Sequence, residues 1–243
     1  MGLDVYVGSL TRYYAGDWLT AMQQYGRDNG IDVQIVRDAP DPEDKVTDPD
    51  ELRKAVGEWR ASLADGLGCA ADWPEGADLP YWTDQPDWDA FGAIVLAAAY
   101  DIEPRRGPNA PRRLPRPRKP DDPCDWASAP AVRAAATHPE PYVTLLSGVE
   151  WWLPVFEGPK VFAGQRPDGE IVGMGRIDHL VGELEWLAGR LGLSDQARRD
   201  EVREAGPLPA GAPVLDVARY GLSVLLPLAR RARDERQPLL LDY

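Results

Sequence analysis

The residues best suited to do chemistry lie in a polar segment, Ser9 to Asp17, which contains Arg12, Tyr13 and Tyr14. A guanidinium can hold a carboxylate or a phosphate through two hydrogen bonds, and two tyrosines can form an aromatic wall beside it. The alternative is that Arg12 pairs with a carboxylate of the chain itself and that the tyrosines pack with their hydroxyl groups outward. The choice depends on the elements that position these side chains.

A strand predicted over residues 3–7 leads into this segment. Its apolar residues alternate with Asp4 and Tyr6, so a strand places these two side chains on one face. In open α/β arrangements, ligands bind at the carboxyl ends of strands. We therefore predict a ligand- or partner-binding site that includes Asp4, Tyr6, Arg12, Tyr13 and Tyr14.

Four tryptophans extend the predicted site. Trp73, Trp82, Trp151 and Trp152 fall in expected loops or strand ends among acidic residues. Aromatic rings beside carboxylates suit a cationic or sugar-like ligand, or the centre of a protein interface. The alternative is core packing, which we expect for the tryptophans at or beside helical core positions: Trp18, Trp59, Trp88 and Trp186.

Familiar catalytic motifs are incomplete or absent. The sequence has no Gly-x-x-x-x-Gly-Lys-Ser/Thr loop, which excludes a P-loop NTPase. Residues 173–178 half-resemble a dinucleotide fingerprint, but Asp178 replaces the third glycine, so we predict only a tight strand-to-helix turn. Ser147 lacks the Gly-x-Ser-x-Gly elbow, and a helix start explains Asp178 as well as an orienting role for His179 does. No motif identifies a reaction.

The potential metal ligands are scattered. Cys69, Cys124, His138 and His179 lie far apart, whereas structural zinc sites usually take their ligands in close pairs. We therefore predict no metal, no cofactor and no disulfide framework.

Acidic residues dominate the charge. The chain has 40 acidic and 27 basic residues, a net charge of −13. Nucleic-acid binding needs clustered cations, so this balance disfavours it and suits solubility, a cationic protein partner or a cationic ligand. The exception is residues 103–123, where prolines alternate with basic side chains from Arg105 to Lys119. We interpret this segment as a surface loop or linker, with a polyanion-binding arm or a proline-rich ligand as alternatives.

The hydrophobic patterns predict an α+β fold with a mixed sheet of about five or six strands covered by helices. The fold opens with a βαβ-like unit over residues 3–38, whose helix ends at Asn29-Gly30 and whose second strand covers 31–36. Further helices are expected over 49–66, 86–102, 126–137, 177–191, 194–204 and from 214 onward, and further strands over 142–146, 149–156, 161–163 and 170–172.

We predict a single domain over residues 1–243. The longest apolar runs fall well short of the roughly 20 residues that a bilayer span needs. Asp4 interrupts any apolar signal sequence at the N-terminus, so we expect a cytoplasmic protein without membrane association.

Charge, tryptophan content and the lack of catalytic motifs together predict a binding function. We expect an acidic protein-binding module, such as an inhibitor of the immunity or antitoxin type that acts on a basic partner. The alternative is a small-molecule enzyme, such as a hydrolase, with its polar site at the end of the first strand.

Overall fold

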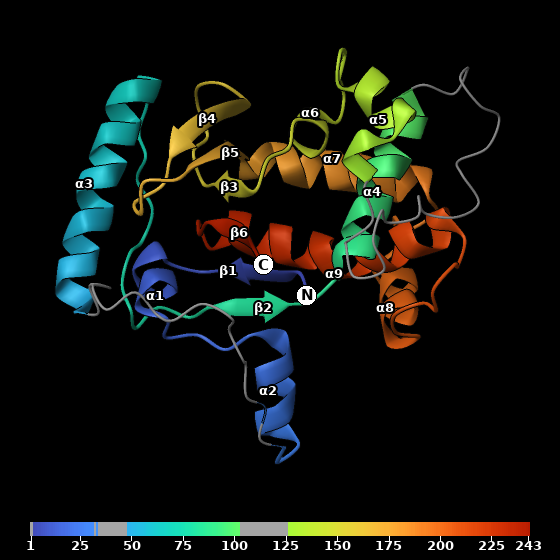
Figure 1. Ribbon diagram of the computed structural model, residues 1–243, viewed down its shortest axis with the longest axis horizontal. Coiled ribbons are helices and arrows are strands. Elements are labelled where there is room, and N and C mark those ends of the chain that lie inside the picture. Colours follow the sequence, from blue (N-terminus) through green and yellow to red (C-terminus); the bar gives the residue numbers. More distant parts are fainter. Residues whose placement is uncertain (1, 32, 34–47, 103–125) are drawn as a thin grey trace.

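A six-stranded sheet organises the computed structural model, which describes residues 2–31, 33, 48–102 and 126–243 (Figure 1). Its strand order is β2-β1-β6-β3-β5-β4, and β3 and β5 are its parallel pair. The strands are β1 (Asp4–Val7), β2 (Trp82–Asp84), β3 (Trp151–Leu153), β4 (Val161–Gln165), β5 (Ile171–Arg176) and β6 (Leu239–Asp242). The predicted α+β class and mixed sheet are confirmed.

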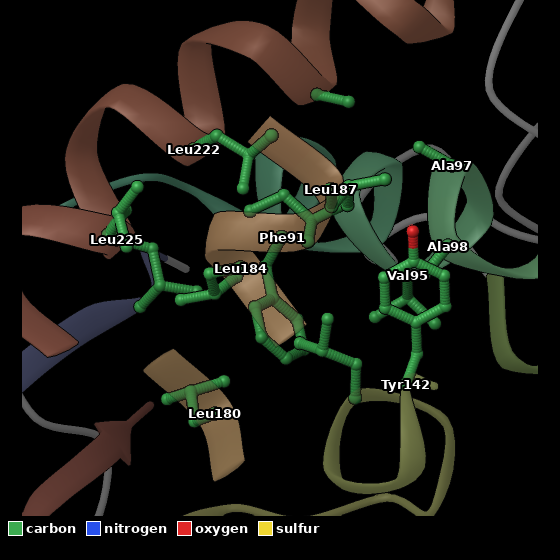
Figure 2. Close-up of a cluster of buried hydrophobic side chains, with 14 of the residues drawn as sticks. Phe91, Val95, Ala97, Ala98, Tyr142, Leu180, Leu184, Leu187, Leu222 and Leu225 are labelled. Atoms are coloured by element: carbon green, nitrogen blue, oxygen red, sulfur yellow. The ribbon is translucent and has the colours of Figure 1, made fainter. Parts of the chain in front are cut away.

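Helices cover the first face of the sheet. The face carries Val5, Leu241 and Trp152, and it packs against α4 (Trp88–Ile102), α7 (Ile177–Arg190) and α9 (Val214–Asp234). Figure 2 shows the apolar side chains of these helices meeting around Phe91 and Leu184. The smaller helices are α5 (Pro130–Ala135), α6 (Val143–Leu146), α8 (Gln196–Glu204) and a 3-10 turn, η1 (Trp126–Ser128).

The α4 and α9 backbones approach closely at Gly221. An added Cβ there would lie 2.8 Å from the carbonyl oxygen of Ala90, a backbone atom that cannot easily move. At Gly182 of α7, by contrast, an added Cβ would meet nothing within 4 Å.

These two glycines predict opposite effects of the same substitution. Gly221→Ala should lower the free energy of unfolding by about 1–3 kcal/mol through overpacking. Gly182→Ala should raise it by up to about 1 kcal/mol, because alanine favours the helix more than glycine does. Urea unfolding of both variants measures the difference, and equal effects would contradict the assigned α4–α9 contact.

The second face of the sheet carries Tyr6, Leu240 and Trp151 and packs against other elements. They include α1 (Leu10–Ala15) and α3 (Pro49–Leu67). Helix α3 begins at residue 49, as predicted, with Asp48 as its N-cap and Pro49 as its first residue. Helix α2 (Ala21–Asp28) extends away from the sheet in Figure 1. The alternation of the strands thus gives the sheet two buried faces.

Most predicted elements are confirmed, and the corrections have local causes. Residues 142–146 form the α6 turn, and Glu183 caps it through the backbone N–H groups of Thr144 and Leu145. Residues 10–15 form α1 instead of a loop, and β2 and β6 were not predicted. Trp186 is 58% exposed, so its expected core position is wrong.

Two predicted features cannot be compared with the structure. The strand expected over 31–36 lies mostly outside the described residues, and so does the Pro/Arg-rich segment 103–123. Strand β1 and the helix that ends before Asn29-Gly30 are confirmed parts of the opening unit. None of the described helices is both long enough and apolar enough to cross a membrane.

Candidate functional site

Helix α1 turns the chain back over the sheet directly after β1. Ser9 caps it: its Oγ accepts a hydrogen bond from the Arg12 N–H at 3.2 Å and donates one to the Gly76 carbonyl at 2.6 Å. The carboxylate of Glu75 accepts hydrogen bonds from the N–H groups of Leu10 (3.2 Å) and Thr11 (3.0 Å). The start of α1 therefore holds a carboxylate of the chain itself.

Arg12 also has its partners within the chain. It donates a hydrogen bond to the Asp17 carbonyl at 2.8 Å and pairs with the Asp17 carboxylate at 3.2 Å. Its guanidinium lies 5.0 Å from the ring centroid of Tyr81, and 14% of its side chain is exposed. These contacts match the alternative in which Arg12 pairs with a carboxylate of the protein.

The predicted tyrosines meet one predicted tryptophan on the second face of the sheet. The ring centroids of Tyr6 and Tyr13 are 5.3 Å apart, and those of Tyr13 and Tyr14 lie 6.2 and 6.4 Å from that of Trp151. Trp73 joins this group through Trp59, and its indole donates to Glu75 at 2.8 Å. Tyr6, Trp73 and Trp151 are buried, so the aromatic convergence is a packed core.

The other two predicted tryptophans lie on the first face. Trp82 is the cross-strand partner of Val7 and has the Arg231 guanidinium 5.0 Å from its ring. Trp152 is fully buried next to Trp151 but points into the opposite core. The structure therefore separates Trp82 and Trp152 from the remaining predicted residues.

Acidic residues lie at or next to the end of the sheet where β1 and β3 begin and β2 and β6 end; the register places Asp4 and Asp242 on the second face and Asp84, opposite Val5, on the first. We call this set the acidic edge; its members are Asp4, Asp84, Asp87, Glu150 and Asp242. All five are partly buried. Within the described part of the chain, the cation paired with this set is Arg203, which contacts Asp84.

Two members of the acidic edge face each other directly. Asp4 and Asp242 are cross-strand partners, an arrangement in which like charges repel. Burial is the main cause that raises the pKa of Asp4; Asp242 and Asp84 raise it further, while the Ala21 N–H, 3.3 Å from Oδ1, lowers it. The Tyr13 hydroxyl donates to Asp242 at 2.6 Å. The predicted Asp4 and Tyr13 are therefore linked through Asp242.

Asp87 and the exposed ring of Tyr243 also belong to this region of the surface. Burial also raises the pKa of Asp87, whose carboxylate accepts a hydrogen bond from the Ala90 N–H at 2.7 Å. Tyr243 is 62% exposed; its ring packs against Trp88, with 4.8 Å between centroids. Burial and Glu150 raise the pKa of Tyr243.

The segment 173–178 and His179 belong to β5 and α7. Gly173 lies inside β5 rather than in a turn, and an added Cβ would come 2.5 Å from the Gly148 carbonyl oxygen. Asp178 pairs with Arg176 at 2.6 Å, and burial lowers the pKa of His179. No set of three or more His, Cys, Asp or Glu side chains suited to a metal occurs among the residues that the structure describes.

Comparisons with known proteins add no functional assignment. No protein-family model matches the chain, and neither a curated protein nor a solved structure gives a significant match. The chain is therefore described by its fold class, α+β. A fold class does not determine function, so the function is inferred from the residues on the protein surface.

Proposed function

We propose that this chain is an acidic protein-binding module whose acidic edge contacts a basic partner. The observation that carries the proposal is the position of five partly buried carboxylates at or next to the same end of four neighbouring strands, with a single described cation paired to them. An inhibitor of the immunity or antitoxin type is the specific form that we favour. We also propose a cytoplasmic location, where the free thiol of Cys69 would stay reduced.

Electrostatics supports this proposal. Burial, Asp242 and Asp84 raise the pKa of Asp4, so the charged form of this carboxylate is destabilised, and an approaching cation would stabilise it. The net charge of −13 would also speed the encounter with a basic protein. Tyr243, exposed beside these acids, offers the kind of aromatic anchor that protein interfaces favour.

The contacts give less support to a small-molecule enzyme at the end of the first strand. Arg12 and Glu75, the charged groups nearest that end, bond to backbone and side-chain groups of the chain itself. A reaction there would first require these contacts to break.

The test compares two double variants in affinity capture from the native host. Glu150→Gln with Asp242→Asn removes two charges from the acidic edge, while the control, Glu58→Gln with Asp65→Asn, removes two exposed charges from α3. We expect wild type and the control variant to retain the same basic protein, and the edge variant to lose it.

Salt dependence provides the second readout. Titration calorimetry with the captured protein should give an affinity that falls as salt rises, because exposed charge pairs are screened. The edge variant should bind about tenfold or more weakly than wild type, by loss of close charge pairs. Equal retention of both variants, or capture of acidic proteins only, would contradict the proposal.

A further inference from the structure

A cavity of about 480 Å³ lies away from the acidic edge, between α8, the residues that follow α7, and the first turns of α9. Helix α8 packs against α9 at the right of Figure 1. Cavities that hold small molecules have volumes of roughly 300–1,000 Å³. This cavity therefore has the size of a small-molecule site.

Apolar side chains form much of the lining. They come from four segments, namely the residues after α7, α8, the α8–α9 connection and α9: Leu191, Leu193, Val202, Leu208 and Tyr220. Leu208 remains 40% exposed, so this part of the lining is in contact with solvent. An apolar wall with an open side suits a ligand whose body is apolar and whose head group stays near water.

The charged residues that line the cavity are mostly basic, whereas the chain as a whole is acidic. Arg198 and Arg219 line the cavity, and Asp216 is the acidic residue among the described lining residues. Asp84 and Asp87, which influence the hydroxyl group of Tyr220, do not line it. A cavity with two cations and one anion is an exception on a protein of net charge −13.

Both arginines can accept a further anion. Arg219 donates from Nε to the Leu191 carbonyl at 3.1 Å and from Nη1 to Asp216 at 2.5 Å, and a guanidinium has five N–H donors in total. Arg198 pairs with Glu201 at 2.6 Å, and 61% of its side chain is exposed. Exposed ion pairs of this kind contribute only about 0–1 kcal/mol, so a ligand can compete with them.

Hydrogen bonds of Arg199 brace the chain beside the arginines. Arg199, which is 4% exposed, donates to the carbonyls of Leu193 (2.6 Å) and Ser194 (2.8 Å) and to the Gln196 side chain (2.7 Å). These bonds tie α8 to the connection between α7 and α8, which contributes Leu191 and Leu193 to the lining. A preformed wall lowers the entropic cost of binding.

We propose that this cavity binds an amphipathic carboxylate, with its apolar tail against Leu191, Val202 and Tyr220 and its head group at Arg198 and Arg219. The evidence is the juxtaposition of an apolar wall with two guanidinium groups in an otherwise acidic protein. This site is separate from the acidic edge and does not depend on the proposed protein partner.

The test uses decanoate as the probe and the full chain as the protein. Titration calorimetry and amide chemical-shift changes should show saturable binding of decanoate below its micelle concentration, with shifts centred on residues 191–193 and 202–208. Decanol, which has the same tail but no charge, should bind about tenfold or more weakly, as expected for loss of a charge-assisted hydrogen bond. Decylammonium should bind more weakly still.

Variants assign the binding to the cavity. Leu208→Glu places a negative charge at the exposed side and should weaken decanoate binding about tenfold; Arg198→Gln should weaken it about threefold to tenfold. Arg133→Gln, the same change at an exposed position of α5, should have no effect. Both test positions are exposed, so folding should be preserved, and circular dichroism checks this.

Any one of three results would overturn the proposal. Decanol or decylammonium binding as tightly as decanoate would remove the role of the arginines. Decanoate binding that Leu208→Glu and Arg198→Gln leave unchanged would place the ligand elsewhere. No saturable binding of decanoate below its micelle concentration would show that the cavity is not a carboxylate site.

Discussion

Replacing Glu183 with alanine should lower the free energy of unfolding by about 3 kcal/mol or more. Glu183 is 4% exposed, and its carboxylate accepts hydrogen bonds from Thr144 N–H (2.8 Å), Thr144 Oγ1 (2.9 Å) and Leu145 N–H (2.9 Å). Alanine would leave these donors buried without a partner, at a cost of about 1–3 kcal/mol for each unsatisfied group. The midpoint of thermal unfolding should fall by about 6 °C or more.

The control for this prediction is Glu185, two residues further along α7. Glu185 is an exposed residue that pairs with Arg230 at 2.8 Å, so Glu185→Ala should change stability by about 1 kcal/mol or less. Urea and thermal unfolding compare the two variants. A loss at Glu183 no larger than the loss at Glu185 would show that α6 does not depend on its carboxylate cap.

The same carboxylate should make stability depend on pH. Burial raises the pKa of Glu183 from 4.5 to about 7, although the hydrogen bonds from Thr144 and Leu145 lower it in part. A raised pKa means that the folded protein holds the proton more tightly than the unfolded chain. This contribution to stability is therefore complete below about pH 4.5 and is lost as the pH rises through about 7. Glu183→Gln does not titrate, so the fall in stability between pH 5 and pH 8 should be smaller in that variant.

The sequence predicted those parts of the fold that depend on local pattern. Helices α7 and α9 have continuous apolar faces, and α3 has an N-cap aspartate followed by proline, so each was found from its own residues. Strands β4 and β5 were predicted as short apolar segments over 161–163 and 170–172, and the Pro167-Asp168-Gly169 segment between them suits the turn of the hairpin that they form. These features need no knowledge of distant parts of the chain.

The errors concern segments whose structure is set by distant residues. Val143–Leu146 is apolar enough for a strand, but Glu183, about forty positions away, binds its N–H groups and fixes a helical turn. Strand β6 is too short to be distinguished without its neighbours β1 and β3. The pairing that defines these elements is not visible in the local sequence.

In the candidate site, too, features set by the local sequence were predicted, and those set by distant residues were not. Alternation correctly placed Asp4 and Tyr6 on one face of β1, and the tyrosines of α1 did converge with Trp151. Asp242, however, joins the site only through its register with Asp4. An apolar run that ends in aspartate at Leu239–Asp242 was the available signal, but its cross-strand partner could not be inferred from it.

Replacing Glu75 with alanine should lower the free energy of unfolding by about 2–4 kcal/mol. Its carboxylate accepts from the N–H groups of Leu10 and Thr11, from the Thr11 hydroxyl at 2.9 Å and from the Trp73 indole at 2.8 Å. It thus joins the start of α1 to Trp73, which is buried in the core on the second face of the sheet. Buried hydrogen bonds to a charged group contribute about 1.5–3 kcal/mol each. The partial exposure of Glu75 keeps the expected loss below the sum of its bonds.

Two further variants make the Glu75 prediction specific. Glu75→Gln keeps one acceptor oxygen but brings an NH₂ group towards the donors, so its loss should be intermediate. Asp72→Ala removes a carboxylate that is 83% exposed and pairs with Arg60, so it should cost about 1 kcal/mol or less. Urea unfolding gives the three values, and near-ultraviolet circular dichroism should change in Glu75→Ala because Trp73 loses its hydrogen-bond acceptor beside Trp59. If Glu75→Ala and Asp72→Ala cost the same, α1 is held in place by its apolar contacts with the sheet and not by the Glu75 carboxylate.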